Sequence, residues 1–551
     1  MAAALLAAAL AAIGHILGWQ GVDTAAQVYR VDTYRRTGFE LWDFRWYGGH
    51  WTPDYSLLYP PLAATLGIFT ATVLSAGLAA LAFDRLARRH LDGGWPASLI
   101  FAAGTLVAAS IGQLTFLAGA ALGLSALWAA DRGWWPAAAV LAPACALTSP
   151  LTGAFLALAA LAWALSGIHP RGWRARTAAA RTAPAPPTAP ARPTERRGRG
   201  LAPVALLAAL AALAAAPVLA GAVLFPGDGP MPYPVPDWLW EMGVAAGLAL
   251  AAGPRHRVVR IGALLWMGLA TVSVLVASPL GGNVGRMEDL FALPLAAGLV
   301  WTRIPVLLPF AAVPLALSQW GPAWGSFTEG ATPSAVHRSF YTGLDAALGR
   351  AADRGPAGRV EVVPTEWHWE AAYVTPVLPL ARGWERQLDE ADNPLFYAPG
   401  PLDPFTYRSW LVDNGVRFVA LPSAPLDLAG RREAGLVAAG AVPGLNLIWQ
   451  DTGWRLYAVA DSPGIVSGPA RLVSTGDGRL VLDAAAAGAS TVRVRWSPDW
   501  YVSGGNGCVS RAGDWLSVHA DGPGSITLEL SLLDPGRTAC RPSVAVSSKA
   551  L

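Results

Sequence analysis

The residue whose type and position most suggest chemistry is Asp23, which follows the first apolar segment of the chain almost at once. Three arginines, Arg30, Arg35 and Arg36, come shortly after it. A carboxylate can take a proton from a hydroxyl group as a general base, and the planar guanidinium of arginine suits phosphate. This pattern predicts acid–base chemistry on a phosphate-bearing substrate at a membrane surface.

A second polar segment, Ser278–Leu290, reads SPLGGNVGRMEDL and separates two apolar runs. Charges at the mouth of a membrane helix are rarely left unpaired and often mark a substrate path. We expect Arg286 to bind the phosphate of a donor, with Arg30 assisting it. We also expect Asn283 and Glu288 to bind substrate, and the glycines between them would let the backbone approach a ligand closely. The alternative is an arginine–carboxylate clasp that only closes the helix bundle.

The loop over residues 20–59 is far longer than a bare connector and is rich in tryptophan and tyrosine. Aromatic side chains can stack on sugar rings, but they also form the belts that anchor proteins at a membrane surface. The carboxylates later in this loop are interpreted as solvated: Asp32, Asp43 and Asp54. The substrate-binding interpretation names Trp46, Tyr47, His50 and Tyr55 of this loop, Gln113 of a later turn, and Trp367 and His368 of a Trp-rich segment. For the Trp-rich segment, the alternative is a domain core.

The elements that must position these residues are apolar runs, which fill the chain up to about Trp320. Only 14% of the residues are charged, against about 25% in a soluble chain. A helix needs about 20 apolar residues to cross a bilayer. The first run is interpreted as a retained span rather than a cleaved signal peptide. About eleven runs suit membrane spans: 1–19, 60–82, 95–112, 113–130, 134–148, 151–167, 201–225, 237–252, 261–279, 288–301 and 304–320.

Arginine placement orients these spans. Basic segments at Asp84–His90, 170–200 and Pro254–Arg260 fall on one side, which the positive-inside rule makes the cytoplasm. The segment 170–200 is interpreted as a disordered cytoplasmic linker. Residues 1–320 then form a transmembrane domain with Asp23 and Arg286 on its outer side. We expect these two side chains to border one outward-opening cleft and to lie within about 15 Å of each other.

The chain beyond Trp320 has a globular composition and would lie outside the cytoplasm. Alternating helix-like and strand-like stretches predict an α/β domain over residues 321–462. Short strands separated by turns predict a small β-sandwich over residues 463–551. Cys508 and Cys540 lie in this last region, where both a disulfide and two free thiols remain open. Cys145 lies within an apolar run and is interpreted as a core residue.

The motifs of several enzyme classes do not occur in the sequence. There is no Walker phosphate loop, no dinucleotide-binding glycine fingerprint, no HExxH motif and no paired-cysteine metal spacing. This disfavours ATP hydrolysis and nicotinamide chemistry, and we expect neither a cofactor nor a metal. The net charge of +3 is too small to indicate binding to nucleic acid.

Several stretches resemble a known family. These are WDFRWYGGH and YSLLYPPL in the first loop, FPGDGPMPYP, PLGGNVGRMEDLFALP and the segment Arg359–Tyr397. They are similar to large actinobacterial membrane proteins, some of which carry the label 6-pyruvoyl-tetrahydropterin synthase-related. The order of a first span, an acidic residue, a long outer loop, many spans and an outer domain resembles the GT-C superfamily of membrane glycosyltransferases. The adjacent acidic pair of many GT-C members does not occur here.

The resemblance implies a GT-C-like helical bundle and a sugar donor linked to polyprenyl phosphate. It also implies a general base in the first outer loop, which maps onto Asp23. The leading hypothesis is therefore a plasma-membrane glycosyltransferase of cell-envelope assembly. Its acceptor would be a glycan or a lipid, and the protein would be in contact with membrane lipid. A transporter or flippase of a lipid-linked glycan and a non-catalytic assembly scaffold are the alternatives. Transporters usually have repeated halves, and no such repeat is found in this sequence.

Overall fold

The computed structural model describes residues 1–53, 55–167, 194–227, 229–301, 308–328, 334–476 and 478–540. Most of the predicted linker 170–200 and Asp54 lie outside these residues. The chain divides into two units, each assembled from three segments. Unit 1 contains Met1–Arg35, Pro53–Val336 and Arg386–Ala391, and unit 2 contains Arg36–Thr52, His337–Glu385 and Asp392–Leu551. The expected domain boundaries at residues 320 and 462 remain predictions.

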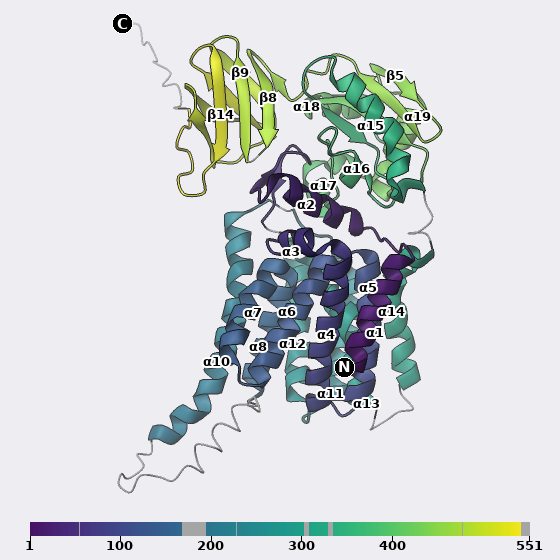
Figure 1. Ribbon diagram of the computed structural model, residues 1–551, viewed down its shortest axis with the longest axis vertical. Helices are drawn as coiled ribbons and strands as arrows, with labels where there is room; N and C mark the ends of the chain where they lie inside the picture. Colours follow the sequence, from purple (N-terminus) through teal and green to yellow (C-terminus); the bar gives the residue numbers. More distant parts are fainter. Residues whose placement is uncertain are drawn as a thin grey trace. The chain divides into compact units, whose positions relative to one another are not determined.

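Unit 1 is a helical bundle (Figure 1). Its apolar segments form helices because each helix satisfies its own backbone hydrogen bonds, which lipid cannot do. Each of the eleven apolar runs expected from the sequence contains a helix in the described residues. These helices are α1 (Ala2–Ile16), α4 (Ile68–His90), α5 (Gly94–Ile111), α6 (Leu114–Asp131), α7 (Trp135–Thr148), α8 (Pro150–Ser166), α10 (Thr194–Leu224), α11 (Val235–Ala252), α12 (Arg257–Leu275), α13 (Arg286–Val300) and α14 (Leu308–Thr328).

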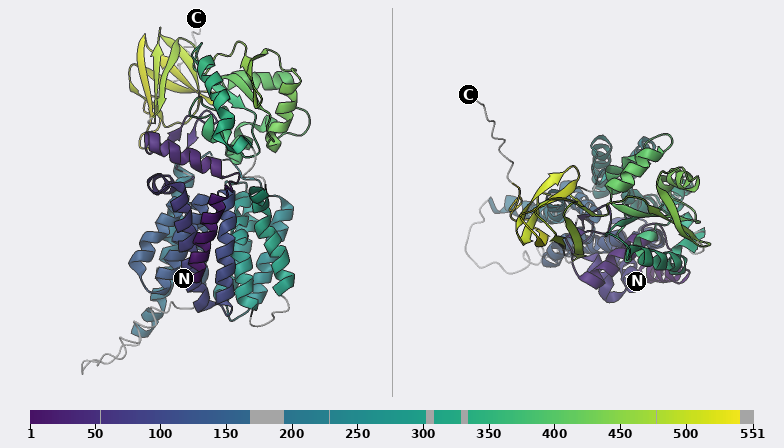
Figure 2. Two further views of the ribbon diagram at one scale, coloured as in Figure 1. Left: turned by 45° about the vertical axis from the view of Figure 1, so that its right-hand side comes forward. Right: turned by 90° about the horizontal axis from the view of Figure 1, so that it is seen from above.

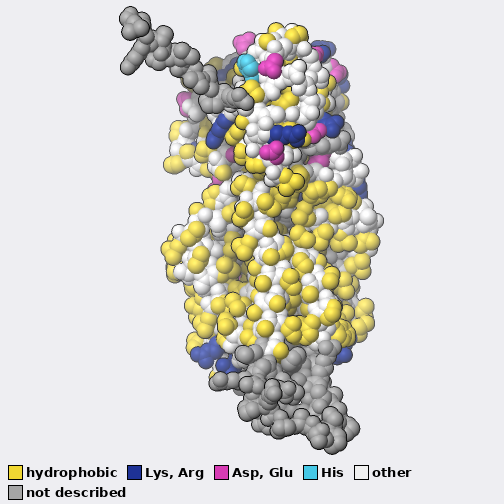
Figure 3. Space-filling view, turned by 90° about the vertical axis from the view of Figure 1, so that its left-hand side faces the viewer, with side chains coloured by type: hydrophobic (Ala, Val, Ile, Leu, Met, Phe, Trp, Pro, Cys, Tyr) yellow, Lys and Arg dark blue, Asp and Glu magenta, His cyan; other side chains and the backbone are white. Residues whose placement is uncertain are grey.

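Five segments of this bundle are long and apolar enough to cross a membrane. They are Ile68–His90, Gly94–Ile111, Leu114–Asp131, Ala202–Leu224 and Arg257–Leu275. Three shorter helices, α1, α7 and α8, are also apolar. Hydrophobic side chains cover the outer surface of the bundle on the face drawn in Figure 3. The chain is therefore a membrane protein, while the count of eleven spans stays a prediction.

Small side chains let the helices of the bundle approach closely. Ala3, Ala7 and Ala11 recur every fourth residue along α1 and are fully buried in a cluster with Ala76 and Ala80 of α4. Such small-residue faces are typical of helix packing in membranes, where van der Waals contact replaces the hydrophobic effect. Two short helices, α2 (Thr24–Thr37) and α3 (Tyr59–Leu66), connect α1 to α4. Helix α2 lies across one end of the bundle (Figures 1 and 2).

Unit 2 contains a mixed sheet in the strand order β3-β4-β6-β5. Strand β3 runs parallel to β4, and the other neighbours are antiparallel. Three of these strands coincide with strand-like stretches of the sequence, RVEVV, RFVAL and WRLYAV. The strands are β3 (Arg359–Val362), β4 (Val416–Pro422), β5 (Leu445–Gln450) and β6 (Trp454–Val459). The helices around them are α15 (Arg338–Ala352), α16 (Glu370–Tyr373), α18 (Pro404–Asp413) and α19 (Arg431–Ala438).

The C-terminal part of unit 2 is rich in β-structure. Two four-stranded antiparallel sheets have the orders β12-β13-β10-β7 and β11-β14-β9-β8. Buried and accessible residues alternate along β9 and β10, as expected when one face of a sheet packs on a core. A disulfide joins Cys508 to Cys540, the pairing that the sequence left open. The strands are β7 (Val466–Ser467), β8 (Ala470–Gly476), β9 (Arg479–Ala484), β10 (Gly488–Arg495), β11 (Trp500–Gly504), β12 (Gly507–Ala512), β13 (Trp515–Ala520) and β14 (Gly524–Leu530).

One segment of the first loop, Arg36–Thr52, belongs to unit 2. Its two short strands, β1 (Trp42–Asp43) and β2 (His50–Trp51), pair with each other. The ring of Trp42 lies edge-on to that of Trp500, with ring centroids 5.7 Å apart. This differs from the expectation of an aromatic anchor at a membrane surface, because the tryptophans here pack inside a folded unit.

Candidate active site

Asp23 and Arg286 form an ion pair within unit 1. The distance from Asp23 Oδ2 to Arg286 Nη2 is 3.5 Å, and the two side chains are 10% and 23% exposed. The two residues were expected within about 15 Å of each other, and they meet directly. The contact links the loop after α1 to the first residue of α13. The expected cleft around them remains a prediction.

Two backbone hydrogen bonds fix the position of Asp23. The N–H of Gly21 donates to the carbonyl of Ser110 at 2.7 Å, and the N–H of Asp23 donates to that of Ile111 at 3.0 Å. The last carbonyls of a helix have no partner inside the helix, so α5 gains acceptors for its end here. A Cβ on Gly21 would lie 2.4 Å from Ile111 Cα, and one on Gly112 would lie 2.3 Å from the nitrogen of Thr24. Only glycine permits this close approach.

A glycine-rich 3-10 turn, η1 (Gly281–Gly285), leads into Arg286. A Cβ on Gly281 would lie 2.0 Å from the carbonyl oxygen of Met231, and one on Gly285 would lie 2.7 Å from Glu241 Oε1. The N–H of Met231 also donates to the carbonyl of Ser278 at 2.9 Å. The sequence analysis interpreted these glycines as positions where the backbone approaches a ligand closely. The structure instead fills the space beside Gly281 and Gly285 with protein atoms.

Helix α2 places further polar groups on the same face as Asp23. Residues 23, 27 and 30 are spaced for one side of a helix. The Nε2 group of Gln27 donates to the hydroxyl of Tyr55 at 2.8 Å. The guanidinium of Arg30 lies 3.6 Å from the centre of the Tyr55 ring. Arg30 and Tyr55, both predicted to bind substrate, are therefore in contact with each other.

Two buried carboxylates lie near the start of α13, one on α13 itself and one on α11 beside Gly285. Glu288 Oε1 accepts hydrogen bonds from Trp240 Nε1 at 2.7 Å and from the Ser318 hydroxyl at 2.8 Å. Glu288 therefore links α13 to α11 and α14, and its predicted role in substrate binding stays a prediction. Glu241, which is 4% exposed, accepts a hydrogen bond from the Tyr233 hydroxyl at 2.6 Å. The sequence interpretation missed Glu241, although a carboxylate within an apolar run is itself a signal of function.

Two other predicted residues of unit 1 lie in turns. Gln113 lies immediately before α6, and its backbone N–H donates to the carbonyl of Ala108 at 2.9 Å. Asn283 lies in η1, where its Nδ2 group donates to the carbonyl of Pro279 at 3.3 Å. Both side chains are partly accessible. Their proposed contacts with substrate remain predictions.

The remaining predicted residues lie in unit 2, not beside Asp23 in unit 1. Trp46 donates from Nε1 to the Thr375 hydroxyl at 3.1 Å, and the Tyr47 hydroxyl donates to the carbonyl of Glu385 at 2.9 Å. The ring of His50 is stacked on that of Trp46, with centroids 5.9 Å apart. Trp46 and Tyr47 are fully buried. These contacts hold unit 2 together, and a role for these residues in sugar binding stays a prediction.

Trp367 and His368 are both buried in unit 2, and each residue is 7% exposed. Nδ1 of His368 lies 3.4 Å from Glu370, and its Nε2 lies 3.6 Å from Asp427. Burial alone would lower the pKa of His368, but hydrogen bonds and charge interactions with Asp427 and Glu370 raise it to about 9. The imidazolium is therefore a structural cation between two carboxylates at neutral pH.

The residues described by the structure contain no group of three or more His, Cys, Asp or Glu side chains placed to hold a metal ion. Around Asp23, the guanidinium of Arg286 contacts the carboxylate, and the guanidinium of Arg30 lies further along α2.

Comparison with protein-family models gives no match, and no curated protein matches the chain. Among solved structures, the chain is similar to the arabinofuranosyltransferase AftD from Mycobacteria, with 17% sequence identity and a TM-score of 0.41. The aligned part covers 87% of this chain and 42% of that one. This chain thus spans less than half the length of AftD.

Proposed function

We propose that the chain is a membrane glycosyltransferase of the GT-C type, which takes sugar from a polyprenyl-phosphate donor for cell-envelope assembly. The observation that supports this most directly is the contact between Asp23 and Arg286. It brings a buried carboxylate and a guanidinium, far apart in the sequence, to one end of a membrane bundle. A base for a hydroxyl and a cation for a phosphate are the two groups that sugar transfer from a lipid phosphate requires.

The closeness of the two groups suggests how a donor would engage them. A separation of 3.5 Å leaves no space for a phosphosugar between them. The donor phosphate competes with Asp23 for Arg286, since a phosphate oxygen accepts the same N–H groups. When the guanidinium turns to the phosphate, Asp23 is released from its ion pair and becomes a stronger base. Donor binding would thus switch on the base.

The transfer step then follows. The Asp23 carboxylate takes the proton of the acceptor hydroxyl as its oxygen attacks the anomeric carbon. The bond from that carbon to the phosphate oxygen breaks, and its electron pair leaves with the polyprenyl phosphate. Arg286, assisted by Arg30, stabilises the charge that develops there. The anomeric carbon is inverted because the attacking and leaving oxygens lie on opposite sides of it.

The assignment of Asp23 is tested by Asp23→Asn, which keeps the shape of the side chain but removes its basicity. We expect transfer from a polyprenyl-phosphate sugar to fall by about 10²–10⁴-fold, the usual contribution of a general base. Asp32→Asn is the matched control, because Asp32 lies in α2, the helix that follows Asp23, with a side chain that is 52% exposed and paired with Arg35 at 3.2 Å. The assay uses the full chain in proteoliposomes.

The alternatives predict different results in the same assay. A flippase moves the lipid-linked sugar across the bilayer without a new glycosidic bond, and a scaffold tolerates Asp23→Asn. If Asp23→Asn transfers sugar as fast as the unmodified chain and Asp32→Asn, the assignment of Asp23 as base is wrong. The C-terminal unit is proposed to lie outside the cytoplasm, on the side of the sugar acceptor.

A further inference from the structure

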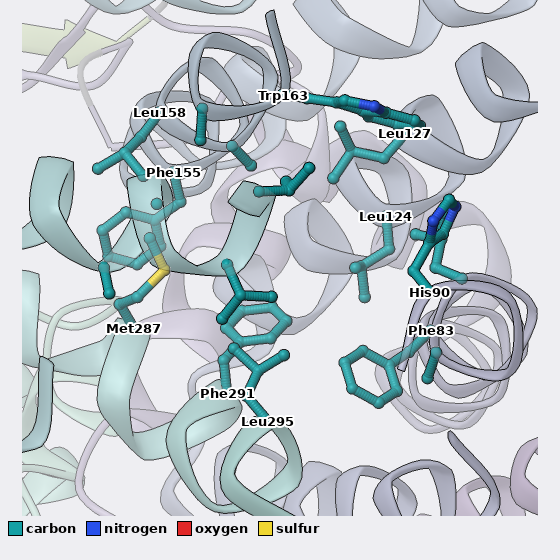
Figure 4. A pocket seen from close by; sticks show the side chains of 18 of the residues that line it. Phe83, His90, Leu124, Leu127, Phe155, Leu158, Trp163, Met287, Phe291 and Leu295 are labelled. Carbon is teal, nitrogen blue, oxygen red and sulfur yellow. The ribbon is translucent and has the colours of Figure 1, made fainter. Parts of the chain in front are cut away.

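A cavity of about 520 Å³ lies inside unit 1, among α4, α6, α8, α12 and α13. Most of its wall is apolar and includes Phe83, Leu124, Phe155, Phe291 and Leu295. Figure 4 shows these side chains arranged around a common space. At about 30 Å³ for each group the size of a water molecule, the cavity has room for about 17 such groups. This volume suits one hydrocarbon chain.

One end of the cavity is polar. It is formed where α4 ends and α12 begins, by Arg89, His90, Asp92, Arg255, His256 and Arg257. Arg255 Nη2 lies 2.9 Å from Asp92, and His256 Nε2 lies 3.3 Å from the same carboxylate. Arg89 is paired with Asp131 at 2.6 Å.

These charges do not balance. Asp92 and Asp131 face three arginines, and Arg257 makes no ion pair with another residue of the described ranges. Arg255 and Arg257 are both exposed, so their guanidinium groups can reach a ligand from outside. An excess of positive charge at the mouth of an apolar cavity is complementary to an anionic head group joined to a hydrocarbon chain.

We propose that this cavity is a binding site for an anionic phospholipid. The hydrocarbon chain of the lipid fills the apolar part of the cavity, and the phosphate of the lipid binds Arg255 and Arg257. The arginine-rich end is the one predicted to face the cytoplasm, where basic pockets between helices bind anionic lipids. Asp23 lies at the other end of α5, so the lipid site is separate from the proposed active site. It does not depend on the chain being a glycosyltransferase.

The apolar part is tested by filling it. Gly262 of α12 lines the cavity, and a Cβ there would have only Ala162 Cβ within 4 Å, at 3.7 Å. Gly262→Phe therefore enters the cavity without a backbone clash. Gly268→Phe is the matched control, because Gly268 lies on the same helix, is exposed and has nothing within 4 Å of an added Cβ.

The polar end is tested by Arg255→Gln/Arg257→Gln. The control is Arg260→Gln, which lies with Arg257 on α12 and does not line the cavity. The full chain is purified in detergent and delipidated. Binding of phosphatidylglycerol, phosphatidylcholine and inorganic phosphate is then measured by native mass spectrometry and by the shift in Tm. We expect phosphatidylglycerol to bind at least tenfold more tightly than phosphatidylcholine. The double arginine variant should lose this preference, and Gly262→Phe should lose binding of both lipids.

Three results would overturn the proposal. The first is equal binding of the two lipids by the unmodified chain. The second is undiminished lipid binding by Gly262→Phe. The third is a Tm shift from inorganic phosphate alone as large as that from phosphatidylglycerol. The site would then bind phosphate, and the hydrocarbon chain of the lipid would contribute nothing to binding. A variant that fails to fold is recognised because it loses the monodisperse protein peak that Gly268→Phe and Arg260→Gln retain. In that case, the proposal is decided by whether an anionic phospholipid co-purifies with the unmodified chain.

Discussion

At the scale of single residues, the contact between Asp23 and Arg286 has two possible roles. It can be a catalytic pair, or it can be a clasp that only holds the loop after α1 to α13. A clasp contributes to the free energy of unfolding, whereas a catalytic base contributes to the transfer rate by accepting a proton. These two roles separate when stability and activity are measured in the same variants.

The prediction concerns Asp23→Asn, Arg286→Gln and the double variant. Each single change breaks the ion pair and leaves one of its two partly buried groups without that partner, which costs about 1–3 kcal/mol. The double change removes both charges, so the Tm should recover towards that of the unmodified chain. Sugar transfer should stay lost in all three variants. Recovery of activity together with Tm in the double variant would identify the contact as a clasp.

A second residue-scale prediction concerns His368. Its pKa is raised to about 9 in the folded chain, against about 6.5 when unfolded. A group with a raised folded pKa contributes its full stability below pH 6.5, and this is lost as the pH rises through 9. The contribution is at most about 3 kcal/mol.

The Tm of unit 2 should therefore fall between pH 6.5 and 9, as followed by near-UV circular dichroism of the full chain. His368→Gln should remove most of this slope, because glutamine carries no proton to lose. His519→Gln is the control, since His519 is an exposed residue of β13. An equally steep slope in His368→Gln would assign the pH dependence to other groups.

At the scale of elements, the turn between α5 and α6 positions the proposed base. Gly112 has a φ of +94°, and a Cβ there would lie 2.3 Å from the nitrogen of Thr24. Gly112→Ala should displace the loop that carries Asp23 and reduce sugar transfer by about 10²-fold, the effect of roughly 1 Å of misplacement. Transfer rates and Tm are measured together. Gly243→Ala, where nothing lies within 4 Å of an added Cβ, should keep full activity.

If Gly112→Ala keeps its activity, the observed position of the loop that carries Asp23 is not required for sugar transfer. A loss of activity with unchanged Tm would instead separate positioning from folding.

The elements themselves could largely be predicted from the sequence. Apolar runs of suitable length each contain a helix, since their periodicity and composition leave few alternatives in lipid. Strands β9, β10, β13 and β14 were visible as alternating patterns. Strands β5, β8, β11 and β12 were not singled out, and β5 has mostly accessible residues rather than a clear alternation. Edge strands of this kind have a weak sequence signal.

The site could be predicted only in part. Asp23 and Arg286 were found because charges beside apolar helices stand out in a sequence. Their direct contact depends on how the helices pack, which no local pattern determines. The assignment of Arg36–Thr52 to unit 2 was also hidden, since Trp46 meets Thr375 across more than three hundred residues. Glu241 was overlooked because its apolar run was interpreted as a plain span.

At the scale of the whole molecule, the disulfide is the covalent constraint on the β-rich region. It closes a loop across a sequence separation of 32 residues, and it ties β12 to the segment after β14. Removing it with Cys540→Ser should lower the free energy of unfolding of this region by about 4 kcal/mol, mainly because the unfolded chain gains freedom. Urea unfolding of the full chain, followed by tryptophan fluorescence, measures this. Dithiothreitol should reproduce the effect in the unmodified chain and change nothing in Cys540→Ser.

Membership of Arg36–Thr52 in unit 2 imposes an order on biosynthesis. A ribosome completes this Trp-rich segment long before it reaches His337, where the rest of unit 2 begins. Residues 53–336 are translated in between, which at about 5–20 residues per second takes roughly 15–60 s. During that interval, Trp42, Trp46 and Trp51 have no partner strands or helices of unit 2 to pack against. The nascent chain must therefore keep an apolar segment from aggregating while the membrane helices are still being inserted.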